Sequence, residues 1–175
     1  MDDPQQHEDV FAAVEDPDAP PLKVQRFRPD EARGALPEFA ELIDLWLERR
    51  GGEAVPDWSD FDFPDFVGWH AFLMLSRFES DAPDPTFRLA GEKVTDLMQF
   101  QLSGRRLSSL APRNYEQRLR DHFSEIRAQG LIGLTTGQLP VEGRSHAVMR
   151  ILELPFREGG ATVERLLHVM SRTAN

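Results

Sequence analysis

Residues 86–110 read TFRLAGEKVTDLMQFQLSGRRLSSL, and this stretch decides the fold class. Phe87 to Ala90 alternate in hydrophobicity as a short strand does, and Gly91 then ends the strand. Three apolar residues follow at the spacing of one helix face, namely Val94, Leu97 and Met98. Gly104 turns the chain before Leu107. The stretch therefore predicts a strand, a short helix, a glycine turn and a second helical piece.

Periodicity and turn residues predict the elements on either side of this stretch. A mostly apolar strand is expected over Trp69–Phe78, and a long amphipathic helix over Pro112–Gln129, where Gly130 stops it. Three strands close the chain over residues 131–139, 145–154 and 161–171. The predicted order is two strands, two helical regions and three strands.

The stretch also resembles a known family, the PAS-like proteins of alphaproteobacteria. Their pattern reads roughly aromatic-Arg-Leu-x-Gly-x-x-Ile/Val, then Gly-Arg-Asp-Leu-Thr-Gly-Arg-x-Leu-x-x-Leu. The matching residues are Phe87, Arg88, Leu89, Gly91, Val94, Leu102, Gly104, Arg105, Leu107 and Leu110. The sequence departs from the pattern at Gln99-Phe100-Gln101, where the family has Gly-Arg-Asp, so a turn glycine is missing. The resemblance resumes near residues 151–156 and 163–167.

The resemblance covers about Pro56 to the C-terminus and implies a PAS-like sensor domain. It implies the α+β class, with a five-stranded antiparallel sheet, helices on one face and a small apolar cavity between them. We expect three elements to supply the cavity wall: the first strand, the short helix and the long helix. The expected ligand-binding residues are His70, Phe72, Met74, Leu97, Met98, Tyr115, Leu119, His122 and Phe123. The alternative is that these side chains only fill the core.

The chain divides into three parts. Residues 1–27 form an acidic segment that we expect to be disordered, with a short strand at Leu22–Phe27 that could pair with a sheet edge. Residues 28–52 form an amphipathic helix, and residues 53–175 form the PAS-like domain. The helix carries a wide apolar stripe that either docks on the sheet or mediates dimerisation. The residues expected at such an interface are Leu36, Phe39, Ile43, Trp46 and Leu47.

The amino-acid composition disfavours one kind of binding partner and excludes several kinds of chemistry for this protein. The net charge is −10, and residues 1–22 hold seven acidic residues and no Lys or Arg, which disfavours nucleic acid. The chain contains no cysteine, so disulfides, thiolate metal sites, covalent haem attachment and cysteine–chromophore chemistry are excluded. We expect no membrane span and no secretory signal, and therefore a cytoplasmic protein of bacterial origin.

Cofactor signals in the sequence are weak. His122 lies on the long helix, where haem-binding PAS domains carry their iron ligand, but a lone histidine is more often structural. The acidic residues between Asp57 and Asp65 lack the glycine and terminal glutamate of a calcium loop. We predict no metal site and no cofactor; haem and flavin are disfavoured, and a small apolar ligand is the expected occupant.

These observations predict a non-catalytic sensory or regulatory domain in bacterial signalling. It would act through small-ligand binding, through protein–protein interaction, or through both, and we expect a homodimer with a regulatory protein partner. No nucleophile elbow, phosphate-binding loop or dinucleotide fingerprint is present. One alternative is a ligand-free constitutive adaptor or dimerisation module. The other is a small α+β enzyme or ligand carrier, which a deep pocket lined by Tyr115, His122 and Arg88 would favour.

Overall fold

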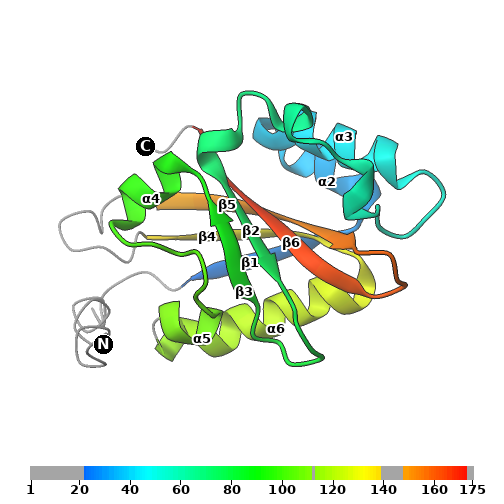
Figure 1. The fold of residues 1–175 in the computed structure, drawn as a ribbon. Coiled ribbons are helices and arrows are strands. Elements are labelled where there is room, and N and C mark those ends of the chain that lie inside the picture. The colour runs from blue at the N-terminus through cyan, green and yellow to red at the C-terminus, as the bar shows by residue number, and fades with distance from the viewer. Residues whose placement is uncertain (1–21, 112, 139–147, 173–175) are drawn as a thin grey trace.

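The computed structural model describes residues 22–111, 113–138 and 148–172, and these residues form one antiparallel sheet with helices (Figure 1). The strand order is β1-β4-β5-β6-β2-β3. The strands are β1 (Lys23–Phe27), β2 (Leu73–Arg77), β3 (Thr86–Ala90), β4 (Ile132–Gln138), β5 (Val148–Arg157) and β6 (Val163–Met170). The predicted α+β class is confirmed, as is the predicted order of strands and helices from β2 onward.

The sheet has six strands rather than five because β1 joins it at one edge. β1 pairs antiparallel with β4, from Lys23 opposite Thr136 to Phe27 opposite Ile132. The short strand predicted at Leu22–Phe27 is therefore confirmed, and the segment expected to be disordered does not include residues 23–27; residues 1–21 lie outside the described residues. Within the described part of the chain, no helix is both long and apolar enough to span a membrane.

The N-terminal helix predicted over residues 28–52 is broken into three pieces. These are α2 (Pro29–Ala35), the 3-10 turn η1 (Pro37–Phe39) and α3 (Ala40–Arg50). Pro37 causes the break, because a proline disfavours helical backbone in the residue before it. Leu36 accordingly leaves the helical region, with φ −128° and ψ 64°. Three further 3-10 turns follow: η2 (Trp58–Asp60), η3 (Phe63–Phe66) and η4 (His70–Phe72).

Helices cover both faces of the sheet. The long helix α6 (Arg113–Gln129) lies on one side, and α2 and α3 lie on the other (Figure 1). Side chains alternate along β5, so Glu153 points to α6 while Phe156 meets the Trp58 ring edge-on at 5.0 Å on the opposite face. The expected helices on one face are therefore joined by an N-terminal layer on the second face. The short helices α4 (Glu92–Met98) and α5 (Leu107–Leu110) complete the fold.

The apolar stripe of the N-terminal segment docks within its own chain. Leu36, Phe39, Ile43 and Trp46 are all buried, and Leu47 is half-buried. The Trp46 indole N–H donates to the carbonyl oxygen of Pro155 at 2.9 Å. Of the two predicted alternatives, this conformation shows docking on the sheet. The four buried side chains are not exposed for a dimer interface, because the sheet already covers them.

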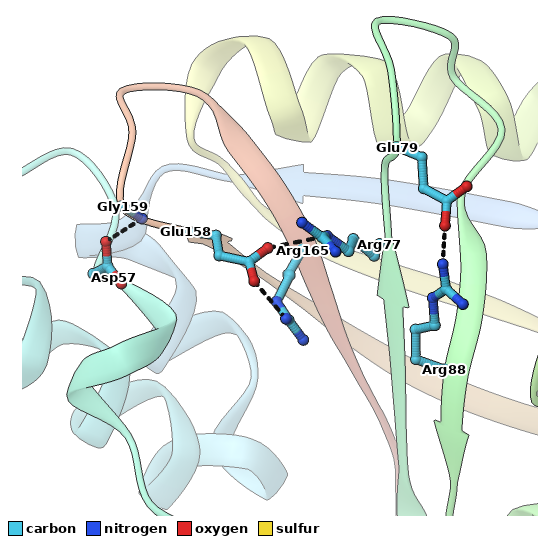
Figure 2. Close-up of polar contacts among 7 residues, drawn as sticks. All are labelled: Asp57, Arg77, Glu79, Arg88, Glu158, Gly159 and Arg165. Atoms are coloured by element: carbon cyan, nitrogen blue, oxygen red, sulfur yellow. Dashed lines mark hydrogen bonds and ion pairs between the residues drawn. The ribbon is translucent and has the colours of Figure 1, made fainter.

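A polar cluster ties the β5–β6 turn to the η2 segment (Figure 2). The carboxylate of Asp57 accepts the Gly159 backbone N–H at 2.8 Å, and Glu158 pairs with Arg165 at 2.7 Å and Arg77 at 3.0 Å. Backbone N–H donors, chiefly that of Ser59, lower the pKa of Asp57 below its usual value, and the Arg165 hydrogen bond lowers the pKa of Glu158. The cluster holds the N-terminal layer against the turn.

Candidate functional site

A cavity of about 130 Å³ lies between α6 and the sheet face that α6 covers. The strands β2 to β6 supply one wall, and α4, α5 and α6 supply the other. Leu22, directly before β1, completes the lining. Most of the lining side chains are apolar, as in most small-molecule sites.

The structure brings five of the nine predicted ligand-binding residues together in this cavity. They are Met74, Met98, Tyr115, Leu119 and Phe123. The other four, His70, Phe72, Leu97 and His122, do not line it. Leu97 is half-buried against the core, while Met98 beside it turns into the cavity.

His70 and Phe72 miss the cavity because β2 begins later than the sequence predicts. Residues 70–72 form the turn η4 instead of the start of the strand, and the Phe72 N–H donates to the Trp69 carbonyl oxygen at 2.8 Å. The close approach of Gly91 accompanies this turn, since a Cβ at Gly91 would lie 2.3 Å from the His70 carbonyl oxygen. The His70 ring stacks on Phe63 with 3.8 Å between ring centroids.

His122 is buried behind the cavity wall, where both of its ring nitrogens have partners. The Arg26 guanidinium donates to Nδ1 at 3.2 Å, and Nε2 lies 3.2 Å from the Glu153 carboxylate. Arginine can only donate, so Nδ1 is the acceptor and the proton sits on Nε2, facing Glu153. A haem iron at His122 would have to displace one of these two contacts.

Sequence reasoning missed four polar residues in the cavity wall: the half-buried Gln138 on β4, and three buried residues, Thr135 on β4, Glu153 on β5 and His168 on β6. Glu153 and His168 are direct neighbours across the β5–β6 pair. Thr135, Glu153 and His168 have exposed fractions of 6%, 1% and 3%. A signal was available in the sequence, because Glu153 interrupts the apolar run ILELPF at residues 151–156, and a charge there must be paired.

The polar side chains of the cavity wall differ in whether they have a hydrogen-bond partner. His168 Nε2 lies 2.8 Å from the Ser76 hydroxyl, and burial lowers the pKa of His168 to about 3. Its imidazole is therefore neutral at pH 7. Thr135 is different: among the described residues its hydroxyl has no hydrogen-bond partner. A buried hydroxyl without a partner costs free energy unless a ligand or water satisfies it.

The arrangement that would favour a small enzyme, with Tyr115, His122 and Arg88 around one pocket, is not present. Tyr115 lines the cavity, His122 lies behind its wall, and Arg88 is exposed on β3 in an ion pair with Glu79 (Figure 2).

The fold and the cavity together define an α+β domain with a partly open apolar cavity between an antiparallel sheet and a long helix. The PAS domain family matches residues 36–171, and the chain belongs to this family. The match begins in the N-terminal layer, earlier than the predicted Pro56, and it carries no restriction to alphaproteobacteria. Membership indicates a sensory or signalling module, a class of domain that is generally non-catalytic. Comparisons with curated proteins and with solved structures find no significant match.

Proposed function

We propose that this protein is a non-catalytic sensor that binds a small molecule in the cavity and reports its presence through a change in protein–protein association. The observation that carries the proposal is the partly polar wall of an otherwise apolar cavity. If this region were only a filled core, apolar side chains would fill it at a lower cost in free energy than Thr135, Glu153 and His168, because burying a polar group is unfavourable.

The route from the cavity to the surface runs through β1. Leu22 lines the cavity, and a Cβ on Gly137 of β4 would lie 2.7 Å from its side chain, so the two segments are in close contact. Arg26, four residues later, bonds to His122. Occupancy of the cavity therefore acts on the start of an edge strand directly, and on Arg26 through the Glu153–His122 contact; among the described strands, β1 pairs with β4 alone. This route differs from a shift of the N-terminal helices, whose stripe packs on the opposite face.

Native mass spectrometry of the freshly purified protein tests the proposal. We expect a mass excess that disappears on denaturation. Ala111→Leu, which places a larger side chain in the cavity wall, should abolish the excess, whereas Ala35→Leu on the exposed end of α2 should keep it. A bare polypeptide mass from cells and after incubation with cell extract would contradict the sensor proposal.

Hydrogen exchange tests the route through β1. Ligand binding should slow exchange of the β1 amides and leave the amides of α3 unchanged, because α3 packs on the other face of the sheet. Protection confined to α3 would contradict this route.

A second candidate function is a ligand-free adaptor or dimerisation module. It is favoured by two exposed apolar side chains around η3, Phe63 and Val67, which are 71% and 76% exposed. Sedimentation across a concentration series tests it. Dimerisation that is lost in the Phe63→Ser/Val67→Ser variant, with no ligand in the cavity, would support this function over sensing.

A further inference from the structure

We propose that the cavity selects a small apolar ring that carries one hydrogen-bond donor and no negative charge, of the kind represented by phenol. The inference rests on the proposed sensor function and names the chemical class of its ligand. It follows from the size of the cavity, from the polar groups in its wall and from its charge.

Size limits the part of the ligand inside the cavity to a single ring. The cavity has a volume of about 130 Å³. An apolar protein cavity of ~150 Å³ accepts benzene, whereas drug-sized ligands need sites of roughly 300 Å³ or more. The part of a ligand that lies inside the cavity without moving the wall therefore has about six to nine non-hydrogen atoms, by comparison with those cavities.

The rings that face the cavity suit an aromatic occupant. Phe87 and Phe123 both line it, and each lies 5.4 Å from the His168 ring between centroids. Aromatic rings at such separations stabilise one another in tilted and edge-on arrangements. A ligand ring beside them would extend this cluster.

The polar groups favour a donor on the ligand. The Thr135 hydroxyl has no partner among the described residues and can accept or donate one hydrogen bond. The Glu153 carboxylate receives Nε2–H of His122 on one oxygen and, when ionised, can only accept. A hydroxyl or N–H on the ligand satisfies either group, whereas a bare hydrocarbon leaves the Thr135 hydroxyl unpaired.

Charge excludes anions from the same place. No Lys or Arg lines the described wall, and the guanidinium of Arg26 reaches Glu153 only through His122. His168 is neutral at pH 7 and offers no positive charge. A carboxylate ligand would lie beside the buried Glu153 carboxylate with no cation to compensate, which is strongly unfavourable in a desolvated site.

Calorimetric titration of the full chain with two matched probe pairs tests the inference. Phenol and toluene have equal numbers of non-hydrogen atoms, as do benzamide and benzoate. Phenol should bind about five- to tenfold more tightly than toluene, the effect of one hydrogen bond. Benzoate should bind at least about tenfold more weakly than benzamide, since its charge has no partner.

Variants assign these differences to particular side chains. Thr135→Val should weaken phenol about five- to tenfold and leave toluene unchanged, because only the hydroxyl is removed. Thr136→Val, at the next residue of β4 and on the other face of the strand, is the matched control and should change neither affinity. Glu153→Gln should bring benzoate to within about threefold of benzamide, because the opposing charge is gone.

The outcomes separate the ligand class from the sensor function. Equal affinities for phenol and toluene, or for benzamide and benzoate, would overturn the proposed class while leaving the cavity as a binding site. No binding of any probe, together with a co-purified ligand in native mass spectrometry, would also overturn the class alone. No probe binding and no co-purified ligand would overturn the sensor function itself.

Discussion

Nε2 of His122 on α6 lies 3.2 Å from the carboxylate of Glu153 on β5, with both side chains buried. The contact needs the glycine that faces Glu153 across the β4–β5 pair. A Cβ at Gly133 would lie 2.6 Å from the Glu153 carboxylate, 2.9 Å from His122 Nε2 and 2.3 Å from Ile126. The absence of a side chain at Gly133 is what lets the helix and strand approach closely enough for the pair to form.

Gly133→Ala should therefore destabilise the protein by about 1–3 kcal/mol, the cost of overpacking a dense core. The matched control is Gly34→Ala, within α2, where a Cβ meets nothing within 4 Å. That substitution should stabilise by roughly 0.5–1 kcal/mol, because alanine is the better helix former. Urea denaturation of the three proteins measures both effects, and equal effects would contradict the packing argument.

Replacing His122 should lower the free energy of unfolding by more than the His122–Glu153 contact contributes to it. His122→Leu leaves the Glu153 carboxylate buried without its main donor, and such a loss costs about 3–5 kcal/mol. The double variant His122→Leu/Glu153→Leu removes both polar groups and should recover at least about half of that loss. A double variant as unstable as the sum of the two single changes would show that the two residues are independent.

The buried His168 makes stability depend on pH. Its pKa is about 3 in the folded protein and ordinarily 6.5, so between these values the unfolded chain binds one more proton than the folded protein. Lowering the pH below 6.5 therefore favours unfolding, by about 1.4 kcal/mol per pH unit or roughly 2 kcal/mol at pH 5.

Denaturation at pH 7 and pH 5 tests this dependence against His168→Gln, which cannot titrate. The wild-type protein should lose about 2 kcal/mol more than the variant over this interval. Asp57 and Glu158, whose pKa values are lowered by hydrogen bonds, lose their contribution mainly below pH 5 and so add little to the difference. The same pH dependence in both proteins would rule out His168 as the source.

Gln99 holds the left-handed position that ends α4, with φ +61°. The PAS-like pattern has a glycine here, and a left-handed backbone costs a residue with a Cβ about 1–2 kcal/mol. Gln99→Gly should therefore stabilise the protein by about 0.5–1 kcal/mol. This net gain is the relief of the left-handed backbone cost minus the larger conformational entropy that glycine loses on folding. Gln101→Gly, at an exposed position just after this turn, should give no gain, and thermal unfolding of the two variants distinguishes them.

The sequence by itself determined the local elements and the class of fold. The alternation at Phe87–Ala90, the helical spacing of Val94 and Met98, and the glycine at Gly91 depend only on near neighbours along the chain. Helix spacing and the family resemblance together placed Met98, Tyr115, Leu119 and Phe123 in the cavity wall, whereas Leu97, predicted on the same face as Met98, does not reach it.

Only the tertiary structure decided which polar groups meet around the cavity. Arg26 and His122 are 96 residues apart and His122 and Glu153 are 31 apart, and no local period relates such positions. Strand register and the packing of α6 on the sheet bring them together. The start of β2 was likewise decided by distant backbone, because the close approach of Gly91 accompanies the turn at residues 70–72. Local preference sets each element, and burial against partners far along the chain sets which side chains share a site.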